Sequence, residues 1–428
     1  MSKASEHVHR RSLLQGIGRA LALAAFAPAL VACGRATASA RPVLTKGSPE
    51  SVGMSSDHVE DVLARIQRRV ADKLFPGAVA LIARRGTIVG ERAFGTRERG
   101  KDEPVTADTL FDLESMTKVL ATSTAALRLV EDGALKLDEP VAARLPEFAA
   151  NGKGAITVRD MLRYSSGLPA DSQFLDDHDD AHVWKRMAAA ALEYETGKRV
   201  LYSDLTYRLL GRVIEAAAGM NLDAFAKARI WGPCGMTDTT FNPAPALIPR
   251  IASTNVSALR GAMVRGHVQD EQDFALGGIA GCDGVFSTAS DVAIFCQMML
   301  NGGEYRGARV LGQQLVADMV KDQTPQVTAA ATDTSPLNNL LLTPKGYGWE
   351  LMTRRFSSGG MRLSPRSYGK AGGAGTFMWI DPERELFGVL LTNHGLPVPF
   401  DEIGWHRMLD AVGPGEFYDG IVGAITGR

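Results

Sequence analysis

The sequence predicts an α/β fold in which an antiparallel sheet is flanked by helices and carries an inserted all-helical domain. Two observations predict this fold. Each end of the chain combines one helical pattern with a pair of strand patterns, and alanine-rich helical patterns dominate the middle. The chain has 428 residues, of which 45% are hydrophobic and 22% charged, so the fibrous and disordered classes are excluded.

The N-terminal part of the sheet follows a helix. Apolar residues recur at three- and four-residue spacing from Ser56 to Lys73, which predicts an amphipathic helix. The segments Ala78–Ala83 and Thr87–Arg92 then flank Arg85 and Gly86, and this pattern is typical of a β-hairpin.

The same pattern returns at the other end of the chain. The strand patterns Thr376–Ile380 and Leu386–Leu391 flank a turn, and a helical pattern over Ile403–Val412 follows. We therefore predict a sheet domain built from residues 45–120 and 285–428, with a helical domain at 121–284. The predicted helices in the middle cover Thr124–Glu131, Val158–Arg163, Trp184–Leu192, Leu205–Ala218 and Asp291–Leu300, and residues 321–341 are predicted to form a surface loop.

The first forty residues have the pattern of an export signal. The pair Arg10 and Arg11 precedes an apolar run and resembles a twin-arginine signal, which a receptor reads. The run Leu21–Ala32 contains Pro28 and falls short of the roughly 20 residues that span a bilayer as a helix.

The end of this run predicts where the signal is removed. Leu30–Cys33 resembles the lipobox of bacterial lipoproteins, in which Cys33 would carry the lipid. The alternative is cleavage after Ala40, at a small-x-small site that leaves no anchor. Both alternatives place the protein outside the cytoplasm, as a periplasmic protein or a membrane-anchored lipoprotein.

The charge and cysteine counts exclude several classes of partner. Lys and Arg number 47 against 48 Asp and Glu, so no basic surface for nucleic acid is indicated. The four cysteines are too few for a disulfide framework and form no Cys-x-x-Cys pair. His178 and His182 stand among aspartates, a pattern more typical of a solvated loop than of a metal site. Cys282 is interpreted as a packed residue, and we expect no metal and no cofactor.

Three motifs carry the predicted chemistry. The first is Ser115–Lys118, at the start of a predicted helix, where residues three apart share one face. A neutral Lys118 amine would then take the Ser115 proton, and the helix N-terminus would favour an oxyanion. A second Ser-x-x-Lys match, Ser367–Lys370, contains glycine and precedes a glycine-rich run, so Ser115 is the better candidate nucleophile.

The other two motifs lie far along the chain. Tyr202 precedes a predicted helix that Asp204 would cap, and a phenol near Lys118 would serve as a base or a proton relay. Lys370 enters a predicted strand before Gly372 and would bind a substrate carboxylate, while the glycines let a substrate lie against the backbone. An ordinary capped helix and a glycine-rich turn are the alternative interpretations.

In this order, the motifs resemble those of the penicillin-recognising serine hydrolases, the group of class C β-lactamases, D-alanyl-D-alanine carboxypeptidases and family VIII-type esterases. The likeness extends over roughly residues 45–415. It implies a β-lactamase-like (transpeptidase-like) fold that needs no cofactor. It also implies site residues: Ser115, Lys118 and Tyr202 as the catalytic residues, the backbone N–H groups of Ser115 and Gly373 as the oxyanion hole, and Asp204, Lys370 and Gly372 as substrate-binding residues.

The implied activity is hydrolysis of a carboxylic ester or amide through an acyl-enzyme on Ser115. How Lys118 and Tyr202 share the proton stays open. Asp204 stands where the family usually has asparagine, and Ala371 stands where it has threonine, so we favour an ester or peptide over a β-lactam. An ionised Asp204 would instead bind Lys118. The alternatives are a β-lactamase or a D-alanyl-D-alanine carboxypeptidase, and a non-catalytic receptor like a penicillin-binding protein.

Overall fold

A mixed sheet of seven strands joins the two ends of the chain. In the computed structural model, which describes residues 41–428 apart from 172–173, 177–178, 325–343, 354–356, 397–401 and 428, its order is β1-β3-β2-β14-β13-β12-β11. All neighbours pair antiparallel except β1 and β3, which are parallel. The strands are β1 Thr45–Lys46, β2 Gly77–Arg84, β3 Thr87–Gly95, β11 Glu350–Leu351, β12 Tyr368–Gly372, β13 Thr376–Asp381 and β14 Leu386–Thr392.

Both predicted hairpins are confirmed. Arg85 and Gly86 have φ angles of 50° and 77°, so two consecutive left-handed residues close the β2–β3 turn. Strand β14 pairs with β2 in a register that sets Val389 opposite Leu81. This pairing places the N-terminal and C-terminal hairpins side by side in one sheet.

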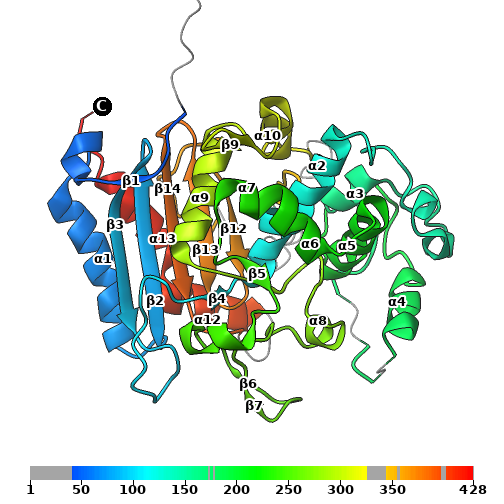
Figure 1. The fold of residues 1–428 in the computed structure, drawn as a ribbon, viewed down its shortest axis with the longest axis horizontal. Helices are drawn as coiled ribbons and strands as arrows, with labels where there is room; N and C mark the ends of the chain where they lie inside the picture. Colours follow the sequence, from blue (N-terminus) through cyan, green and yellow to red (C-terminus); the bar gives the residue numbers. More distant parts are fainter. Residues whose placement is uncertain are drawn as a thin grey trace, which may run out of the picture. The chain divides into compact units, whose positions relative to one another are not determined.

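Helices cover both faces of the sheet, and they explain why the run Ala78–Ala83 within β2 is apolar throughout (Figure 1). One face packs against α1 (Ser56–Ala71), α12 (Glu402–Val412) and α13 (Pro414–Gly423), and it receives Ala80 from β2. The other face packs against α9 (Ala289–Leu300) and receives Leu81. Along this run, side chains that alternate between the two faces all enter an apolar core.

The remaining helices and short strands lie largely between β3 and β11 in the chain. The predicted helices of the middle are found there within a few residues of their expected bounds. The α-helices are α2 Thr124–Glu131, α3 Val158–Leu162, α4 Asp180–Ala188, α5 Asp204–Ala218, α6 Leu222–Ala226, α7 Gly232–Cys234, α8 Glu271–Ala275 and α10 Gln313–Met319. The 3₁₀ and π-helices are η1 Pro49–Val52, η2 Glu114–Met116, η3 Lys118–Ser123, η4 Val141–Ala143, η5 Pro146–Ala149, η6 Lys227–Trp231 and η7 Pro245–Arg250. The short strands are β4 Phe111–Asp112, β5 Thr240–Phe241, β6 Val256–Ser257, β7 Ala262–Met263, β8 Val285–Ser287, β9 Glu304–Tyr305 and β10 Ala308–Arg309.

A small sheet with the order β4-β8-β5 precedes the segment that contains Ser115, because η2 follows β4 in the chain.

Residues 41–428 form one compact unit, and their division into a sheet domain and a helical domain stays a prediction. The export signal with Cys33, and His178, lie outside the described residues, as does most of the loop predicted at 321–341.

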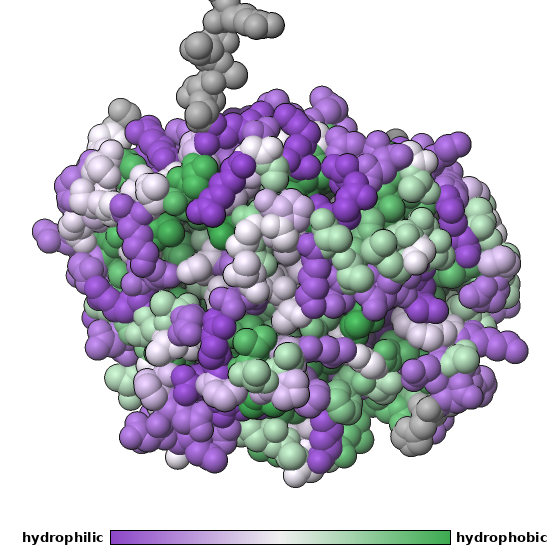
Figure 2. All heavy atoms as spheres, in the orientation of Figure 1, coloured by the Kyte–Doolittle hydropathy of each residue, from purple (hydrophilic) through white to green (hydrophobic). Residues whose placement is uncertain are grey.

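The surface mixes polar and apolar groups. On the face seen in Figure 2, hydrophilic side chains surround separate groups of hydrophobic ones. Val256 and Leu259, in the β6–β7 hairpin, are among the exposed large apolar residues. Within the described part of the chain, no helix has both the length and the apolar character needed to cross a membrane.

Candidate active site

Ser115 and Lys118 meet at the start of a helix, as their spacing predicts. The chain leaves β4, passes through the 3₁₀-helix η2, which contains Ser115, and enters the π-helix η3 at Lys118. The Lys118 Nζ donates a hydrogen bond of 2.8 Å to the Ser115 Oγ. Ser115 is half-buried, whereas the Lys118 side chain is fully buried. Short 3₁₀- and π-helical segments are frequent at functional sites.

Two carboxylates lie beside the Lys118 side chain, which the sequence analysis expects to act as a neutral amine. Its Nζ lies 2.6 Å from the Asp204 Oδ1 and 3.7 Å from the Asp283 Oδ1. Burial alone would lower the pKa of Lys118, but these two carboxylates outweigh it and raise the pKa well above its ordinary value. The two carboxylates thus favour the protonated form of Lys118, and its role as the base stays a prediction.

Asp204 is the first residue of α5, and the start of this helix places its carboxylate beside Lys118. Ser203 caps the helix by accepting a hydrogen bond from the Thr206 N–H, which fixes Asp204 beside Lys118. Burial would raise the pKa of Asp204, but Lys118 and then Arg208 lower it below its ordinary value. Asp204 is therefore ionised and only accepts hydrogen bonds, in keeping with the electrostatic alternative drawn from the sequence.

Tyr202 places its ring among several cations. The Nζ atoms of Lys118, Lys370 and Lys345 lie 5.0, 4.5 and 5.9 Å from its ring centroid. The ring also stacks on Tyr164 at 5.1 Å between centroids. Burial raises the pKa of Tyr202 well above its ordinary value despite the opposing charge of Lys118, so the residue is a neutral phenol.

Lys370 also lies beside the Tyr202 ring, but it pairs with Glu350, whereas the sequence analysis expects it to bind a substrate carboxylate. Its side chain is fully buried in β12, and its Nζ donates a hydrogen bond of 3.1 Å to the Glu350 Oε1 of β11. Burial lowers the pKa of Lys370 below its ordinary value. The binding of a substrate carboxylate by Lys370 stays a prediction, because Glu350 already neutralises this ammonium.

Gly372 and Gly373 lie against the segment that carries the nucleophile. A side chain at Gly372 would collide with the Leu113 carbonyl, and the Thr376 hydroxyl donates a hydrogen bond of 3.1 Å to that same carbonyl. Gly373 borders the Glu114 carboxyl. The geometry thus brings residues 372–373 next to Leu113 and Glu114, which directly precede Ser115, and the oxyanion hole of Ser115 and Gly373 stays a prediction.

Four charged residues of the site escaped the sequence analysis. Asp283 accepts a hydrogen bond of 3.1 Å from the Ser115 Oγ, and Glu350 and the buried Lys345 flank Lys370. Glu114 directly precedes the nucleophile at a φ of 48° and is buried. The sequence signal that could have identified them is a charged residue within an otherwise apolar or glycine-rich segment, as in Gly281–Gly284.

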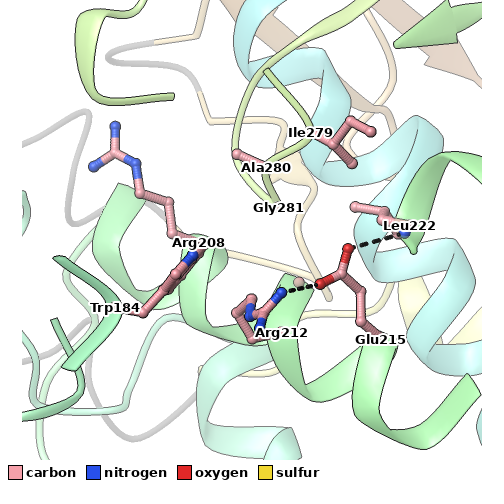
Figure 3. A pocket seen from close by; sticks show the side chains of 9 residues that line it. Trp184, Arg208, Arg212, Glu215, Leu222, Ile279, Ala280 and Gly281 are labelled. Atoms are coloured by element: carbon pink, nitrogen blue, oxygen red, sulfur yellow. Dashed lines mark hydrogen bonds and ion pairs between the residues drawn. The ribbon is translucent and has the colours of Figure 1, made fainter. Parts of the chain in front are cut away.

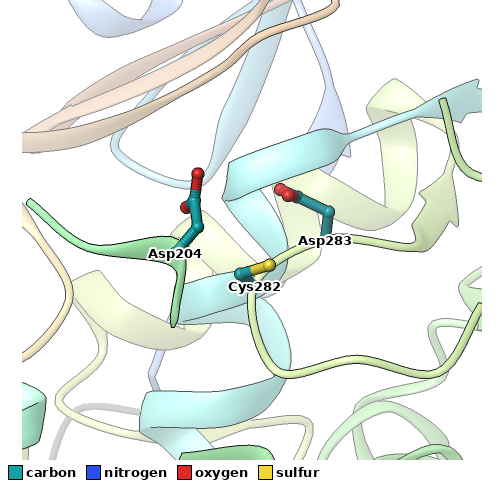
Figure 4. Close-up of side chains that lie close together, drawn as sticks. All are labelled: Asp204, Cys282 and Asp283. Atoms are coloured by element: carbon teal, nitrogen blue, oxygen red, sulfur yellow. The ribbon is translucent and has the colours of Figure 1, made fainter. Parts of the chain in front are cut away.

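Asp204, Cys282 and Asp283 lie close enough together to suggest a metal site (Figure 4). The chemistry of the three groups argues otherwise. The Lys118 ammonium already lies between the two carboxylates, and the Cys282 thiol donates a hydrogen bond of 2.8 Å to the Asp273 Oδ2. Burial raises the pKa of Cys282 well above its ordinary value, so the thiol is neutral and is a poor metal ligand. We therefore assign no metal to this cluster.

Comparison with known proteins places the chain in a family. The Beta-lactamase family model matches residues 62–413. A protein of Escherichia coli (strain K12) named "Putative D-alanyl-D-alanine carboxypeptidase" is 32% identical over 397 residues, covering 83% of this chain and 87% of the relative. A protein of Salmonella typhimurium (strain LT2) with the same name is 28% identical over 427 residues, covering 90% of this chain and 94% of the relative.

Solved structures share the fold. A penicillin-binding protein homolog from Caulobacter crescentus superimposes with a TM-score of 0.66 at 20% identity, covering 85% of this chain and 98% of its own. EstCE1, described as a hydrolase with promiscuous acyltransferase activity, has a TM-score of 0.62 at 21% identity, covering 83% of this chain and 99% of its own. The β-lactamase-like fold expected from the motifs is confirmed. The chain belongs to the beta-lactamase family and is a serine hydrolase of that family.

Proposed function

We propose that the protein hydrolyses a carboxylic ester through an acyl-enzyme on Ser115. The observation that carries this proposal is the contact of 2.8 Å between the Ser115 Oγ and the Lys118 Nζ. A fixed ammonium at this distance stabilises the negative charge that develops on the serine oxygen during attack. Tyr202 completes the catalytic trio, as a neutral phenol that can donate a hydrogen bond.

The charges around the site favour an uncharged ester over a substrate with a carboxylate. β-Lactams and C-terminal D-alanyl peptides both carry a carboxylate, which a free cation would bind. Lys370 is the cation predicted for this task, but it is paired with Glu350. Asp204 is ionised and pairs with Lys118, so it cannot donate a hydrogen bond to a substrate amide carbonyl.

A D-alanyl-D-alanine carboxypeptidase is the second candidate. The observation in its favour is the name given to the Escherichia coli and Salmonella relatives, which match most of this chain. On this alternative, a peptide carboxylate would displace Glu350 from Lys370. β-Lactamase activity requires the same displacement and is the third candidate.

The test is a substrate panel with Ser115→Ala as the blank. Nitrophenyl and short-chain alkyl esters, D-alanyl-D-alanine peptides and a chromogenic cephalosporin are compared by kcat/KM. We expect the esters to be preferred, and a fluorophosphonate probe to label Ser115. Preference for the peptides or the cephalosporin would replace the ester by the second or third candidate. Tight binding of the cephalosporin without any turnover would indicate the non-catalytic receptor.

For the N-terminal segment, we propose export and lipid attachment at Cys33. The supporting pattern is the paired arginines before the apolar run that ends at this cysteine. The intact mass of the membrane fraction, compared with that of Cys33→Ala, tests it. A soluble product of unchanged mass would favour cleavage after Ala40.

A further inference from the structure

Resting on the proposed ester hydrolysis, we infer that Leu396 binds a hydrocarbon chain of the ester and so selects the substrate by the length of that chain. Leu396 follows β14 in the sequence and is half-buried. A side chain built at Gly373 would meet the Leu396 Cδ1 at 2.5 Å, so the leucine packs directly on the backbone of that glycine. Because the Gly373 N–H is a predicted donor of the oxyanion hole, a wall at this place would border the reacting carbonyl group of an ester.

The loop that carries Leu396 is fixed by three hydrogen bonds. The Gly395 N–H donates to the Ala374 carbonyl at 3.0 Å, and the Leu396 N–H donates to the Gln269 Oε1 at 2.9 Å. The side-chain amide of Asn255 donates to the Leu396 carbonyl. Because both the N–H and the carbonyl of Leu396 are bonded, its side chain is held in one position.

Two buried residues, Gln269 and Asp112, connect this loop with the segment of the nucleophile. The Gln269 N–H donates to the Asp112 Oδ2 at 2.8 Å, and the Glu114 N–H donates to the Asp112 Oδ1 at 3.1 Å. Glu114 directly precedes Ser115 in the sequence. The main chain before the nucleophile and the Leu396 side chain are therefore held in a fixed relation, as selection by chain length requires.

The chemistry of the loop favours a hydrocarbon chain over a charged group. The Asn255 amide and the Gln269 side-chain carbonyl are both bonded to the backbone of Leu396, and the leucine side chain itself offers an apolar surface. Burying one CH₂ group against such a surface strengthens binding by about fourfold. A carboxylate at the same place would lose its water without gaining a hydrogen bond from the leucine. The subsite therefore agrees with the uncharged ester proposed above.

A crevice between α4, α5 and the segment Ile279–Gly281 does not offer a comparable site (Figure 3). Trp184, Arg208 and Arg212 line this crevice, and the space between them leaves no room for a water-sized molecule. The Arg212 Nη1 donates a hydrogen bond of 2.7 Å to the Glu215 Oε2 of the same helix. We conclude that this crevice is packing between helices and not a second binding site.

The experiment measures kcat/KM for two series of uncharged esters. In the first series, the acyl chain of a nitrophenyl ester grows from acetyl to octanoyl. In the second series, the alcohol chain of an acetate ester grows from ethyl to octyl. For the wild type, we expect kcat/KM to rise by up to about fourfold per CH₂ group in at least one series. The series that rises shows which side of the ester Leu396 contacts.

Leu396→Asn nearly keeps the size of the side chain and removes its apolar character. We expect the rise to fall below about twofold per CH₂ group, because the chain then lies against a polar amide. Leu396→Phe should instead shorten the longest chain that is accepted, since the larger ring fills part of the subsite. This second variant decides the matter if Leu396→Asn does not fold, as thermal unfolding would show.

Leu259→Asn is the matched control. Leu259 lies in the β6–β7 hairpin, where 65% of the residue is exposed, and it receives the same substitution as Leu396. We expect this variant to keep the wild-type dependence on chain length. An equal loss in both variants would mean that the apolar surface in general, and not a subsite at Leu396, selects the ester.

Two further results would overturn the inference while leaving the proposed function intact. One is a wild-type kcat/KM that does not depend on chain length in either series. The other is a Leu396→Asn variant whose dependence on chain length equals that of the wild type. A preference for peptides or the cephalosporin would instead contradict the proposed ester. In that case, the rates at which alkyl fluorophosphonates of increasing length label Ser115 still test Leu396, because labelling needs no turnover.

Discussion

Three buried lysines surround the Tyr202 ring and differ in their countercharge. Lys118 lies close to the carboxylates of both Asp204 and Asp283. Lys370 forms its ion pair with Glu350, and the same carboxylate acts on Lys345. All three side chains are fully buried.

The pKa shifts of the three lysines differ in direction although all three are buried. Two carboxylates raise the pKa of Lys118, whereas burial lowers the pKa of Lys370 and lowers that of Lys345 to about 7. At Lys118, the two close carboxylates outweigh burial, whereas at Lys370 and Lys345 burial outweighs the nearby carboxylates. Lys118 therefore keeps its proton, and Lys370 and Lys345 give up theirs more easily.

Removing the cation on the serine side should have the largest effect. Lys118→Met leaves Asp204 and Asp283 buried without their partner, so we expect a loss of about 3 to 5 kcal/mol in unfolding free energy. Activity should fall about 10²- to 10³-fold, because the serine oxygen loses its ammonium donor. Denaturant unfolding and ester hydrolysis measure the two effects.

Lys153→Met is the matched control for this variant. Lys153 is also buried, but its Nζ donates to the Ala190 carbonyl, outside the site. The control should keep its activity. Equal losses of activity in both variants would mean that Lys118 matters only for packing.

Removing the Glu350 carboxylate should have the next largest effect. Glu350→Gln takes away the negative charge that acts on both Lys370 and Lys345, at an expected cost of about 3 kcal/mol at neutral pH. The cost should shrink as the pH rises, because both lysines have lowered pKa values and lose their protons more easily. Adding Lys345→Met should recover part of the stability, and a double variant no more stable than Glu350→Gln would argue against a shared carboxylate.

Replacing Lys345 alone should stabilise the protein. Its folded pKa of about 7 lies below the ordinary value near 10.4. Between these values the unfolded chain binds the proton more tightly, so wild-type stability rises with pH, by up to about 1.4 kcal/mol per pH unit. Lys345→Met should remove that rise and gain about 1 to 2 kcal/mol at pH 7. A pH dependence identical to that of the wild type would contradict the lowered pKa.

The smallest effect is expected at Glu114. Its Oε1 has no hydrogen-bond partner among the described residues, and burial and then Asp112 raise its pKa well above the ordinary value. A raised carboxyl pKa costs stability above about pH 4.3, where the unfolded chain ionises. Glu114→Gln should therefore gain about 1 kcal/mol at pH 7 and nothing at pH 4, as thermal unfolding at the two pH values would show.

Much of the fold could be predicted because local rules govern it. Neighbouring residues alone determine the hairpin turn at Arg85 and Gly86. The same is true of the apolar residues that recur every three or four positions in α1. Helix α13 was missed, because Pro414–Gly423 contains several glycines and has little intrinsic helix propensity. It forms through packing, since Gly420 lies against Val62 of α1.

The candidate site could be predicted only in part. Ser115 and Lys118 are three residues apart, and helical geometry brings them together. Asp283 and Glu350 act on residues far away in the sequence, and only the tertiary fold shows which charge they face. For the same reason, the protonation state of Lys118 could not be predicted from its spacing to Ser115.

The charge of Lys118 is the central claim, and ¹⁵N NMR of its Nζ tests it most directly. The signal is identified by its absence in Lys118→Arg protein and is followed from pH 6 to 11. We expect the chemical shift of an ammonium group up to at least pH 10. The shift of a neutral amine at pH 7 to 8 would contradict the account and return Lys118 to the role of base.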